Sequence, residues 1–169
     1  MRRISIIITS LLLAFSLSAC GYGSTPETAK MGPAGNGADA VIGTIKVQEV
    51  LVINDGTNAV LTAVIVNTSD QEETLLGASV DYHLLNLVDT SSGAAVKNDA
   101  FLIAPKSSLT LSFAGPYGAI FNQADIPTVG EDVKVNFAFA ENGFVDVRAL
   151  VFANTEYYAS INPSAFAVN

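Results

Sequence analysis

The chain is poor in the side chains that carry most protein chemistry. Its 169 residues include one cysteine, one histidine, two methionines and no tryptophan. A single cysteine excludes a disulfide within the chain, so the fold has to be held together by its core. No nucleophile elbow, zinc-protease, Walker A or dinucleotide-binding motif occurs in the sequence. The sequence therefore contains no candidate catalytic motif, and we expect a protein that is not an enzyme.

Basic residues are also scarce. Eight lysines and arginines stand against sixteen aspartates and glutamates, which gives a formal net charge of −8. Two of the eight are Arg2 and Arg3, so removal of the first nineteen residues would leave a net charge of −10. A domain this acidic does not neutralise phosphates and is repelled by an anionic lipid surface. Nucleic acid is therefore excluded as a partner, and membrane attachment needs another source.

An apolar segment lies at the N-terminus. Arg2 and Arg3 precede a mostly apolar run at residues 4–17, which is the pattern of an export signal. The run is short for a membrane-spanning helix, and the residues after it are polar and rich in glycine. The pattern predicts a signal peptide at residues 1–19.

The only cysteine follows this run directly. Leu17-Ser18-Ala19-Cys20 resembles the lipobox of bacterial lipoproteins. The resemblance implies cleavage between Ala19 and Cys20, a diacylglycerol on the Cys20 thiol, and acylation of the new amine by a chain such as palmitate. Two or more acyl chains anchor a protein stably. An ordinary secretory signal with a leftover thiol is the alternative, and we expect lipidation, which places the protein at the extracytoplasmic face of the cell membrane.

Beyond the anchor the chain divides into three parts. Residues 20–40 are rich in glycine, alanine, proline and small polar residues, which is typical of a flexible tether. Residues 41–154 carry the apolar runs and form one β domain of ordinary size. Residues 155–169 make up a C-terminal tail that is apolar enough to pack on this domain.

The domain alternates apolar and polar residues with the period of a β-strand. Val133, Val135, Phe137 and Phe139 share one face of a predicted strand, and Asn142-Gly143 is typical of the tight turn of a hairpin. Similar patterns recur in segments that include 44–53, 59–67, 74–80, 83–90, 108–113, 117–121 and 143–152. Seven or eight strands with no amphipathic helix predict an all-β fold, a single antiparallel β-sandwich of two sheets.

Three segments resemble the periplasmic copper chaperone family PCu(A)C. They are AVIVNTSDQEETLLGASV at residues 63–80, IAPKSSLTLSFAGPYGAIF at 103–121 and VNFAFAENGFVDVRALV at 135–151. The similarity covers residues 42–152. It implies an immunoglobulin-like or cupredoxin-like Greek-key sandwich, in agreement with the alternation.

The resemblance also implies a site for Cu(I) made by two histidines and two methionines, which suit a soft ion. Tyr117 matches the family's tyrosine. Gly118 stands where a histidine is expected, Ile120 stands where a methionine is expected, and the earlier histidine position falls near Val88. None of these three residues can bind copper through its side chain.

The remaining donors do not replace the lost ones. After cleavage the chain would keep one histidine, His83, and one methionine, Met31, which lies in the predicted tether. We therefore expect a family member that has kept the scaffold and lost the metal, with no cofactor. His83 as a lone copper ligand is the weaker alternative. It could also be a general base beside Asp81, or a surface histidine next to Tyr82.

Two further groups of residues are candidates for binding. Asp70, Glu72 and Glu73 could offer oxygen ligands to Ca²⁺, although their spacing is more typical of a solvated turn. Tyr117 and Phe121 could form a partner surface, because they lie at the end of the domain where the family binds its metal. The alternative is that Tyr117 caps the core.

The sequence as a whole predicts a membrane-anchored lipoprotein of the cell envelope. We expect a non-catalytic accessory module that binds an envelope protein partner. The alternative function is metal delivery, as a copper chaperone of the PCu(A)C type with a degenerate site.

Overall fold

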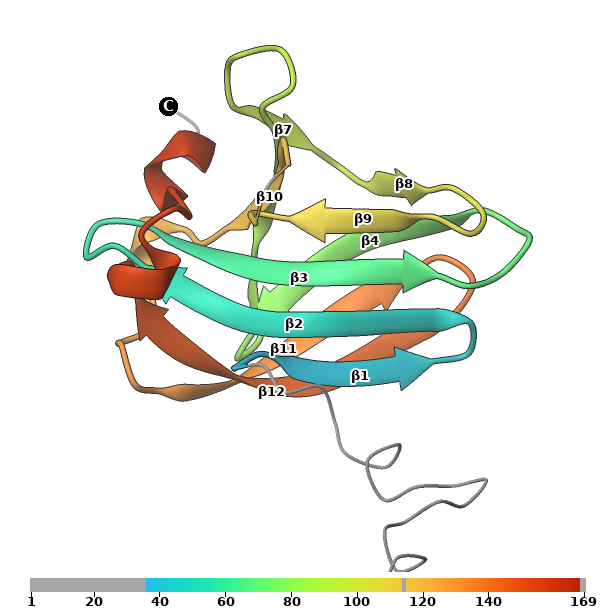
Figure 1. Ribbon diagram of the computed structural model, residues 1–169, viewed down its shortest axis with the longest axis horizontal. Helices are drawn as coiled ribbons and strands as arrows, with labels where there is room; N and C mark the ends of the chain where they lie inside the picture. Colours follow the sequence, from blue (N-terminus) through green and yellow to red (C-terminus); the bar gives the residue numbers. More distant parts are fainter. Residues whose placement is uncertain (1–35, 114, 168–169) are drawn as a thin grey trace, which may run out of the picture. The chain divides into compact units, whose positions relative to one another are not determined.

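The computed structural model describes residues 36–113 and 115–167, and it shows an all-β fold (Figure 1). Cys20, Met31 and the predicted signal peptide lie outside the described residues. The strands are β1 (Ala38–Ile42), β2 (Ile45–Asn54), β3 (Ala59–Asn67), β4 (Glu73–Val80), β5 (His83–Leu84), β6 (Asn86–Asp89), β7 (Val96–Asn98), β8 (Phe101–Ile103), β9 (Ser108–Leu111), β10 (Tyr117–Ile120), β11 (Asp132–Phe139) and β12 (Gly143–Ala153). Three short 3-10 helices accompany them, η3 (Gln123–Asp125), η4 (Glu156–Tyr158) and η5 (Pro163–Phe166). No helix in the described part of the chain is long and apolar enough to span a membrane.

The hairpin of β11 and β12 shows how the alternation produces the fold. All four of its predicted inward residues, from Val133 to Phe139, are buried. Gly143 has a φ of 82°, which glycine adopts without strain, and it closes the turn. Val135 then faces Val147 across an antiparallel ladder. The predicted hairpin is confirmed.

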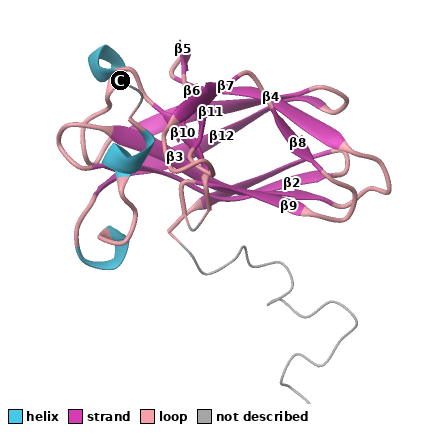
Figure 2. Cartoon of the chain, turned by 90° about the horizontal axis from the view of Figure 1, so that it is seen from above, coloured by secondary structure: helices cyan, strands magenta, loops and turns pink. Residues whose placement is uncertain are grey.

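The strands form one continuous curled sheet, and not the two separate antiparallel sheets that the sequence predicted. The strand order is β5-β4-β11-β12-β2-β3-β9-β10-β6-β7. Strand β12 joins the two layers, because residues 143–150 pair with β11 and residues 151–153 pair with β2. The β12–β2 and β9–β10 pairings are parallel, so the sheet is mixed. Figure 2 shows the two layers from above.

The strands differ from the prediction in number and in bounds, because seven or eight were predicted and the described residues form twelve. Strand β1 begins at Ala38, inside the segment predicted as tether, and it pairs with β2. The strand predicted through Phe113 ends at Leu111, because Ser112 has a φ of 59° that breaks the alternation. Ser112 is therefore buried and Phe113 is 39% exposed.

Apolar side chains gather in two clusters on opposite faces of the sheet. The larger cluster fills the space between the curled layers and includes Leu75, Phe137 and Val151. The smaller one lies on the other face of β2, β3, β6 and β10, where the C-terminal tail covers it. Its buried members are Leu51, Ile53, Val60, Val88, Ile120, Tyr158, Ile161 and Phe166.

Candidate functional site

The positions at which the family resemblance places metal ligands come together in the structure. Strand β10 runs antiparallel to β6, and Gly118 lies directly opposite Val88. Ile120 follows on the same face of β10, since side chains in a strand alternate. The sequence alignment therefore locates one site, at the pairing of β6 with β10.

This site is filled by apolar side chains. Val88 is fully buried and Ile120 is 5% exposed. Phe166 from η5 packs against Gly118 so closely that a Cβ atom there would overlap the phenyl ring. The C-terminal tail thus places an aromatic ring at the position where the resemblance expects a histidine side chain.

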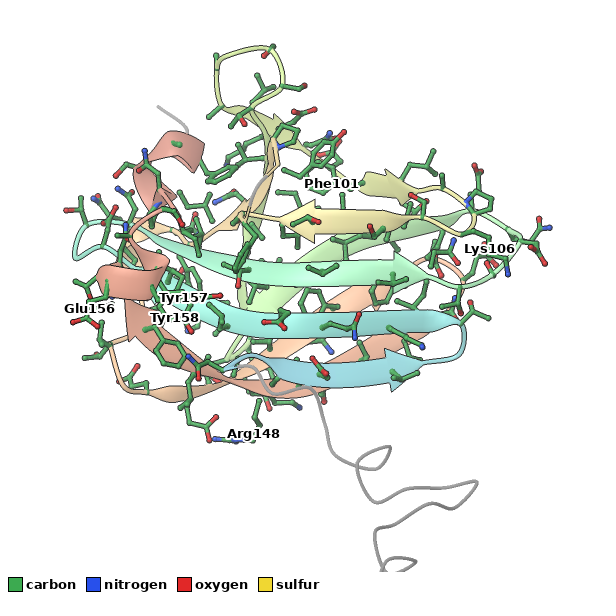
Figure 3. The ribbon with its side chains drawn as sticks, in the orientation of Figure 1. Phe101, Lys106, Arg148, Glu156, Tyr157 and Tyr158 are labelled. Atoms are coloured by element: carbon green, nitrogen blue, oxygen red, sulfur yellow. The ribbon has the colours of Figure 1, made fainter. Side chains whose placement is uncertain are left out.

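Tyr117 and Phe121 do not form the exposed pair that the sequence suggested. Both point to the other face of β10 and contact the larger cluster. Phe121 is only 5% exposed, and the Tyr117 ring centroid lies 4.8 Å from that of Phe101. Because the alternation of β10 directs these side chains inward, Phe121 is a core residue and Tyr117 is half-buried. Phe101 is labelled in Figure 3.

His83 lies at the surface in the short strand β5. Its Nδ1 atom is 3.0 Å from the Asp125 Oδ1 atom. Asp81, the partner considered from the sequence, instead accepts a hydrogen bond of 2.9 Å from the Lys134 backbone N–H. No local sequence pattern indicated the pairing with Asp125, because that residue belongs to η3, far along the chain.

The described residues do not fit a Cu(I) cargo. Thiolate, thioether and imidazole groups bind this soft ion best. In residues 36–113 and 115–167 the only such group is the His83 imidazole. Over the same residues no three His, Cys, Asp or Glu side chains gather as metal ligands do. Oxygen from Asp125 is a hard ligand and does not complete the set.

Two residues of the predicted acidic turn, Asp70 and Glu73, lie in different environments. Asp70 is exposed and pairs with Lys106 at 3.3 Å. Glu73 is only 2% exposed, which corrects its assignment to a solvated turn. It accepts hydrogen bonds from the backbone N–H groups of Thr74, Glu141 and Asn142 and from the Asn142 side chain. Burial raises the Glu73 pKa, but these donors together lower it below its ordinary value. They occupy the oxygens that a cation would need.

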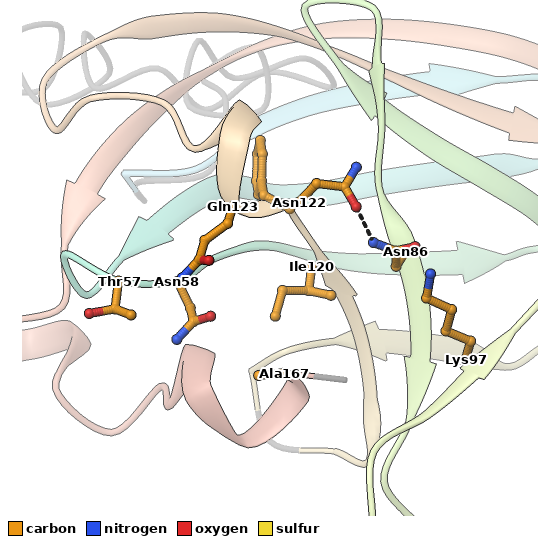
Figure 4. Close-up of a pocket in the computed structure, with 9 residues that line it drawn as sticks. Thr57, Asn58, Asn86, Lys97, Ile120, Asn122, Gln123 and Ala167 are labelled. Carbon is orange, nitrogen blue, oxygen red and sulfur yellow. Dashed lines mark hydrogen bonds between the residues drawn. The ribbon is translucent and has the colours of Figure 1, made fainter. Parts of the chain in front are cut away.

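A cavity lies beside the apolar site, where the β2–β3 turn, β7 and η3 approach one another (Figure 4). Its volume is about 430 Å³. Four of the nine residues that line it carry carboxamides. No local sequence pattern indicated this cavity, because its residues come from distant segments.

Comparison with known proteins shows which solved structures share this fold. No protein-family model matches the sequence, and no curated protein matches it significantly. Solved structures do match. The copper-bound PCuAC domain from PmoF2 is 23% identical with a TM-score of 0.57, and the match covers 68% of this chain and 97% of that one. The apo PCuAC domain from PmoF1 is 23% identical with a TM-score of 0.55, covering 68% and 98%. CuI-DR1885 from Deinococcus radiodurans is 21% identical with a TM-score of 0.51, covering 78% and 89%.

The described domain therefore has the fold of PCuAC domains. The coarse expectation from the sequence, an all-β domain like those of this family, is confirmed. At this level of identity the likeness establishes the fold alone.

Proposed function

We propose that this chain is a lipoprotein of the cell envelope that uses a PCuAC-type fold as a non-catalytic binding module. Cys20 carries the lipid and holds the domain at the extracytoplasmic face of the membrane. The domain binds an envelope partner, catalyses no reaction and does not carry Cu(I) in the manner of the four-ligand site.

One observation carries this proposal. The apolar cluster of Val88, Ile120 and Phe166 occupies the place that the family resemblance assigns to the metal. An apolar, close-packed site offers no electron pair to a cation, and opening it would expose the phenyl ring to water. In this proposal the chain keeps the fold, and the side chains at this position stabilise it instead of binding a metal.

Copper delivery is the second candidate, and it is the function to which the structural neighbours point. Two of these neighbours, the PCuAC domain from PmoF2 and CuI-DR1885, are copper-bound. In this chain, delivery would require His83, Met31 and the Cys20 thiol to act together, before or instead of lipidation.

A Cu(I) titration of the full chain in detergent, against a chelator of known affinity, separates the two functions. The variant Cys20→Ser removes the thiol, and His83→Ala and Met31→Leu remove the other donors. We expect at most weak binding that disappears with Cys20→Ser. Tight one-to-one binding by the unsubstituted chain that Cys20→Ser, His83→Ala and Met31→Leu each abolish would establish copper delivery instead.

A further inference from the structure

A separate cavity lies where two parallel strands end. Strands β2 and β12 are paired in parallel, and their last residues, Asn54 and Ala153, are partners. Because parallel strands end at the same edge of a sheet, the residues that follow them, Asp55 and Asn154, line one cavity. The loop of residues 126–129 forms its third wall. The volume is about 480 Å³, which is within the range of known ligand sites.

Asn54 holds the three walls of this cavity together. Its Nδ2 atom donates a hydrogen bond of 2.8 Å to the Pro127 carbonyl oxygen, and its Oδ1 atom accepts one of 2.6 Å from the Gly56 backbone N–H. The Asn154 backbone N–H donates to the Asn54 carbonyl oxygen at 2.9 Å. The walls are thus fixed before a ligand arrives, and binding to a preformed site costs less conformational entropy.

Asp55 is the one charged residue among those that line the cavity. Its Oδ1 atom accepts hydrogen bonds from the backbone N–H groups of Thr57 and Asn58, and its Oδ2 atom accepts one of 3.0 Å from the Ser164 hydroxyl. Burial raises the Asp55 pKa, but these donors together lower it below its ordinary value, so the group is a carboxylate at neutral pH. A carboxylate has about four lone-pair positions, so Oδ2 can accept a further hydrogen bond.

The surroundings of the cavity add negative charge. Glu131 accepts a hydrogen bond of 2.8 Å from the Thr128 backbone N–H in the third wall, and the exposed Glu156 follows the last lining residue along the chain. No lysine or arginine in residues 36–113 and 115–167 lines the cavity. Arg148 of β12 lies outside the lining and pairs with Asp132 at 3.1 Å. The cavity is therefore an acidic site with no basic residue in its walls.

The remaining walls are largely apolar. Ile126, Pro127, Val129 and Ala153 belong to the lining, and Val129 is 48% exposed. The Asn154 Oδ1 atom is shielded from solvent and accepts no hydrogen bond from the described residues. A buried acceptor without a donor costs free energy, which a ligand N–H group would offset once the Asn154 side chain turns toward it. The site thus suits a ligand that joins a cationic, donor-rich group to an apolar stem.

A bare metal ion fits these walls less well than an organic cation. Among the described residues, no three His, Cys, Asp or Glu side chains gather as metal ligands do. Hard cations need several oxygen ligands around one point, and three of the lone-pair positions on Asp55 already accept protein donors. The apolar walls would also contribute nothing to the binding of an ion.

We propose that this cavity binds an arginine side chain in a basic peptide segment of the envelope partner. The guanidinium group pairs with Asp55, and the aliphatic stem packs on Ile126 and Val129. A guanidinium carries five N–H donors and is more weakly hydrated than an ammonium group, which favours arginine over lysine. The net charge of −8 attracts a basic partner at long range. The inference rests on the proposed function, because it names the chemistry of the partner that the module binds.

The test compares two tripeptides by NMR titration of the full chain in a non-ionic detergent. One has arginine between two alanines, with both ends blocked. The other has citrulline in place of arginine, which replaces the guanidinium by a neutral urea group of almost the same size. We expect the arginine peptide to bind about tenfold more tightly, as one charge-assisted hydrogen bond provides. This preference should shrink at high salt, and the backbone amide signals of Gly56 and Ala153 should shift on binding.

Three variants locate the binding. Asp55→Asn keeps the size of the side chain and one oxygen for the turn, and it should weaken the arginine peptide about tenfold and leave the citrulline peptide unchanged. Val129→Ser removes part of the apolar wall and should weaken both peptides by about threefold. Asp99→Asn is the matched control, because Asp99 is an exposed carboxylate outside this lining, and it should change neither.

Thermal unfolding checks that each variant is folded. Val129 is exposed, so Val129→Ser should fold normally, and it tests the cavity even if Asp55→Asn does not fold. The proposal is overturned if neither peptide binds, if both bind the unsubstituted chain equally tightly, or if folded Asp55→Asn keeps the preference for arginine. Lipid labelling and the copper titration test the envelope proposal without these peptides, so a failure of one is distinguishable from a failure of the other.

Discussion

At the scale of single residues, Glu73 is the clearest case of a charge used for structure. It is buried at the start of β4, and its carboxylate joins this strand to the turn between β11 and β12. Asn142, which donates to Glu73, also accepts a hydrogen bond of 3.2 Å from the Thr44 backbone N–H. One carboxylate thus organises the backbone of two loops and one hairpin. A buried charge is stable only when donors surround it in this way.

Replacing this carboxylate should destabilise the domain. Glu73→Gln puts an NH₂ group among backbone donors, so we expect the free energy of unfolding at pH 7 to fall by about 2–3 kcal/mol. Chemical denaturation measures this, and Glu72→Gln, at an exposed neighbour, is the matched control that should change little.

The same residue sets a pH dependence. Because the Glu73 pKa is lower in the folded state, its contribution is complete above the unfolded pKa of about 4.3 and is lost as the pH falls below it. The difference in the free energy of unfolding between the unsubstituted chain and Glu73→Gln should therefore become smaller below about pH 4. A gap that stays constant down to the folded-state pKa would show that the carboxylate charge contributes nothing.

At the scale of elements, the C-terminal tail decides what the β6–β10 site can be. It carries η4 and η5, and Tyr158, Ile161 and Phe166 from it are buried. The Tyr158 ring also packs on Phe152 of β12, with centroids 5.1 Å apart. Figure 3 shows Tyr157 and Tyr158 at this end of the sheet. The tail is therefore a covering layer of the fold, as its apolar composition suggested.

A double-mutant cycle tests whether Phe166 fills the space above Gly118. Phe166→Ala should lower the free energy of unfolding by about 3 kcal/mol, as for other buried aromatic residues. Gly118→Ala should cost about 1–3 kcal/mol, because its Cβ overlaps the ring. In the Phe166→Ala background that cost should largely disappear, since the ring is gone.

The control for this cycle is another strand glycine. A Cβ at Gly77 in β4 meets no atom within 4 Å, so Gly77→Ala should be close to neutral in both backgrounds. If Gly118→Ala lowers the free energy of unfolding equally with and without the phenyl ring, Phe166 does not fill the space above Gly118.

The strands show which parts of the fold could be predicted from the sequence. Alternation is a local signal, so it predicted β2, β3, β4, β11 and β12 and the turn at Asn142-Gly143. It does not encode which strands become neighbours, and the parallel pairing of β12 with β2 was missed for that reason. Strand β1 was missed because its alanine-rich sequence looks like the tether.

The candidate site was predictable only in part, for the same reason. The family pattern located Gly118 and Ile120, and it placed the earlier histidine near Val88, their neighbour across the sheet. Nothing local indicated that Phe166 would cover Gly118, or that Asn86 would meet Asn122, because both contacts join distant segments. The position of the site was therefore predictable from the sequence, whereas the phenyl ring that fills it and the cavity beside it were not.

At the scale of the whole molecule, the acidic charge opposes the membrane attachment that we propose. Without its first nineteen residues the chain would carry a net charge of −10, so anionic headgroups repel the domain. Exposed apolar residues such as Leu84, Phe144 and Tyr157 come from different elements. If the protein is attached to a membrane as proposed, lipid on Cys20 is the source of attachment that we expect, and stable anchoring then requires more than one acyl chain.

A lipid anchor on Cys20 predicts how membrane attachment responds to substitution and to salt. In bacterial cells fed a clickable palmitate analogue, the unsubstituted chain should take up the label and stay in the membrane fraction through a 1 M salt wash, because acyl chains are not screened by ions. Cys20→Ser should lose the label, whereas Ser18→Ala, which keeps a small residue before the cleavage point, should retain it. Label on Cys20→Ser, or release of the unsubstituted chain by salt, would mean that something other than a lipid on Cys20 holds the protein. The acidic domain would then need a cationic partner at the membrane surface, since its own charge gives it no attraction to lipid.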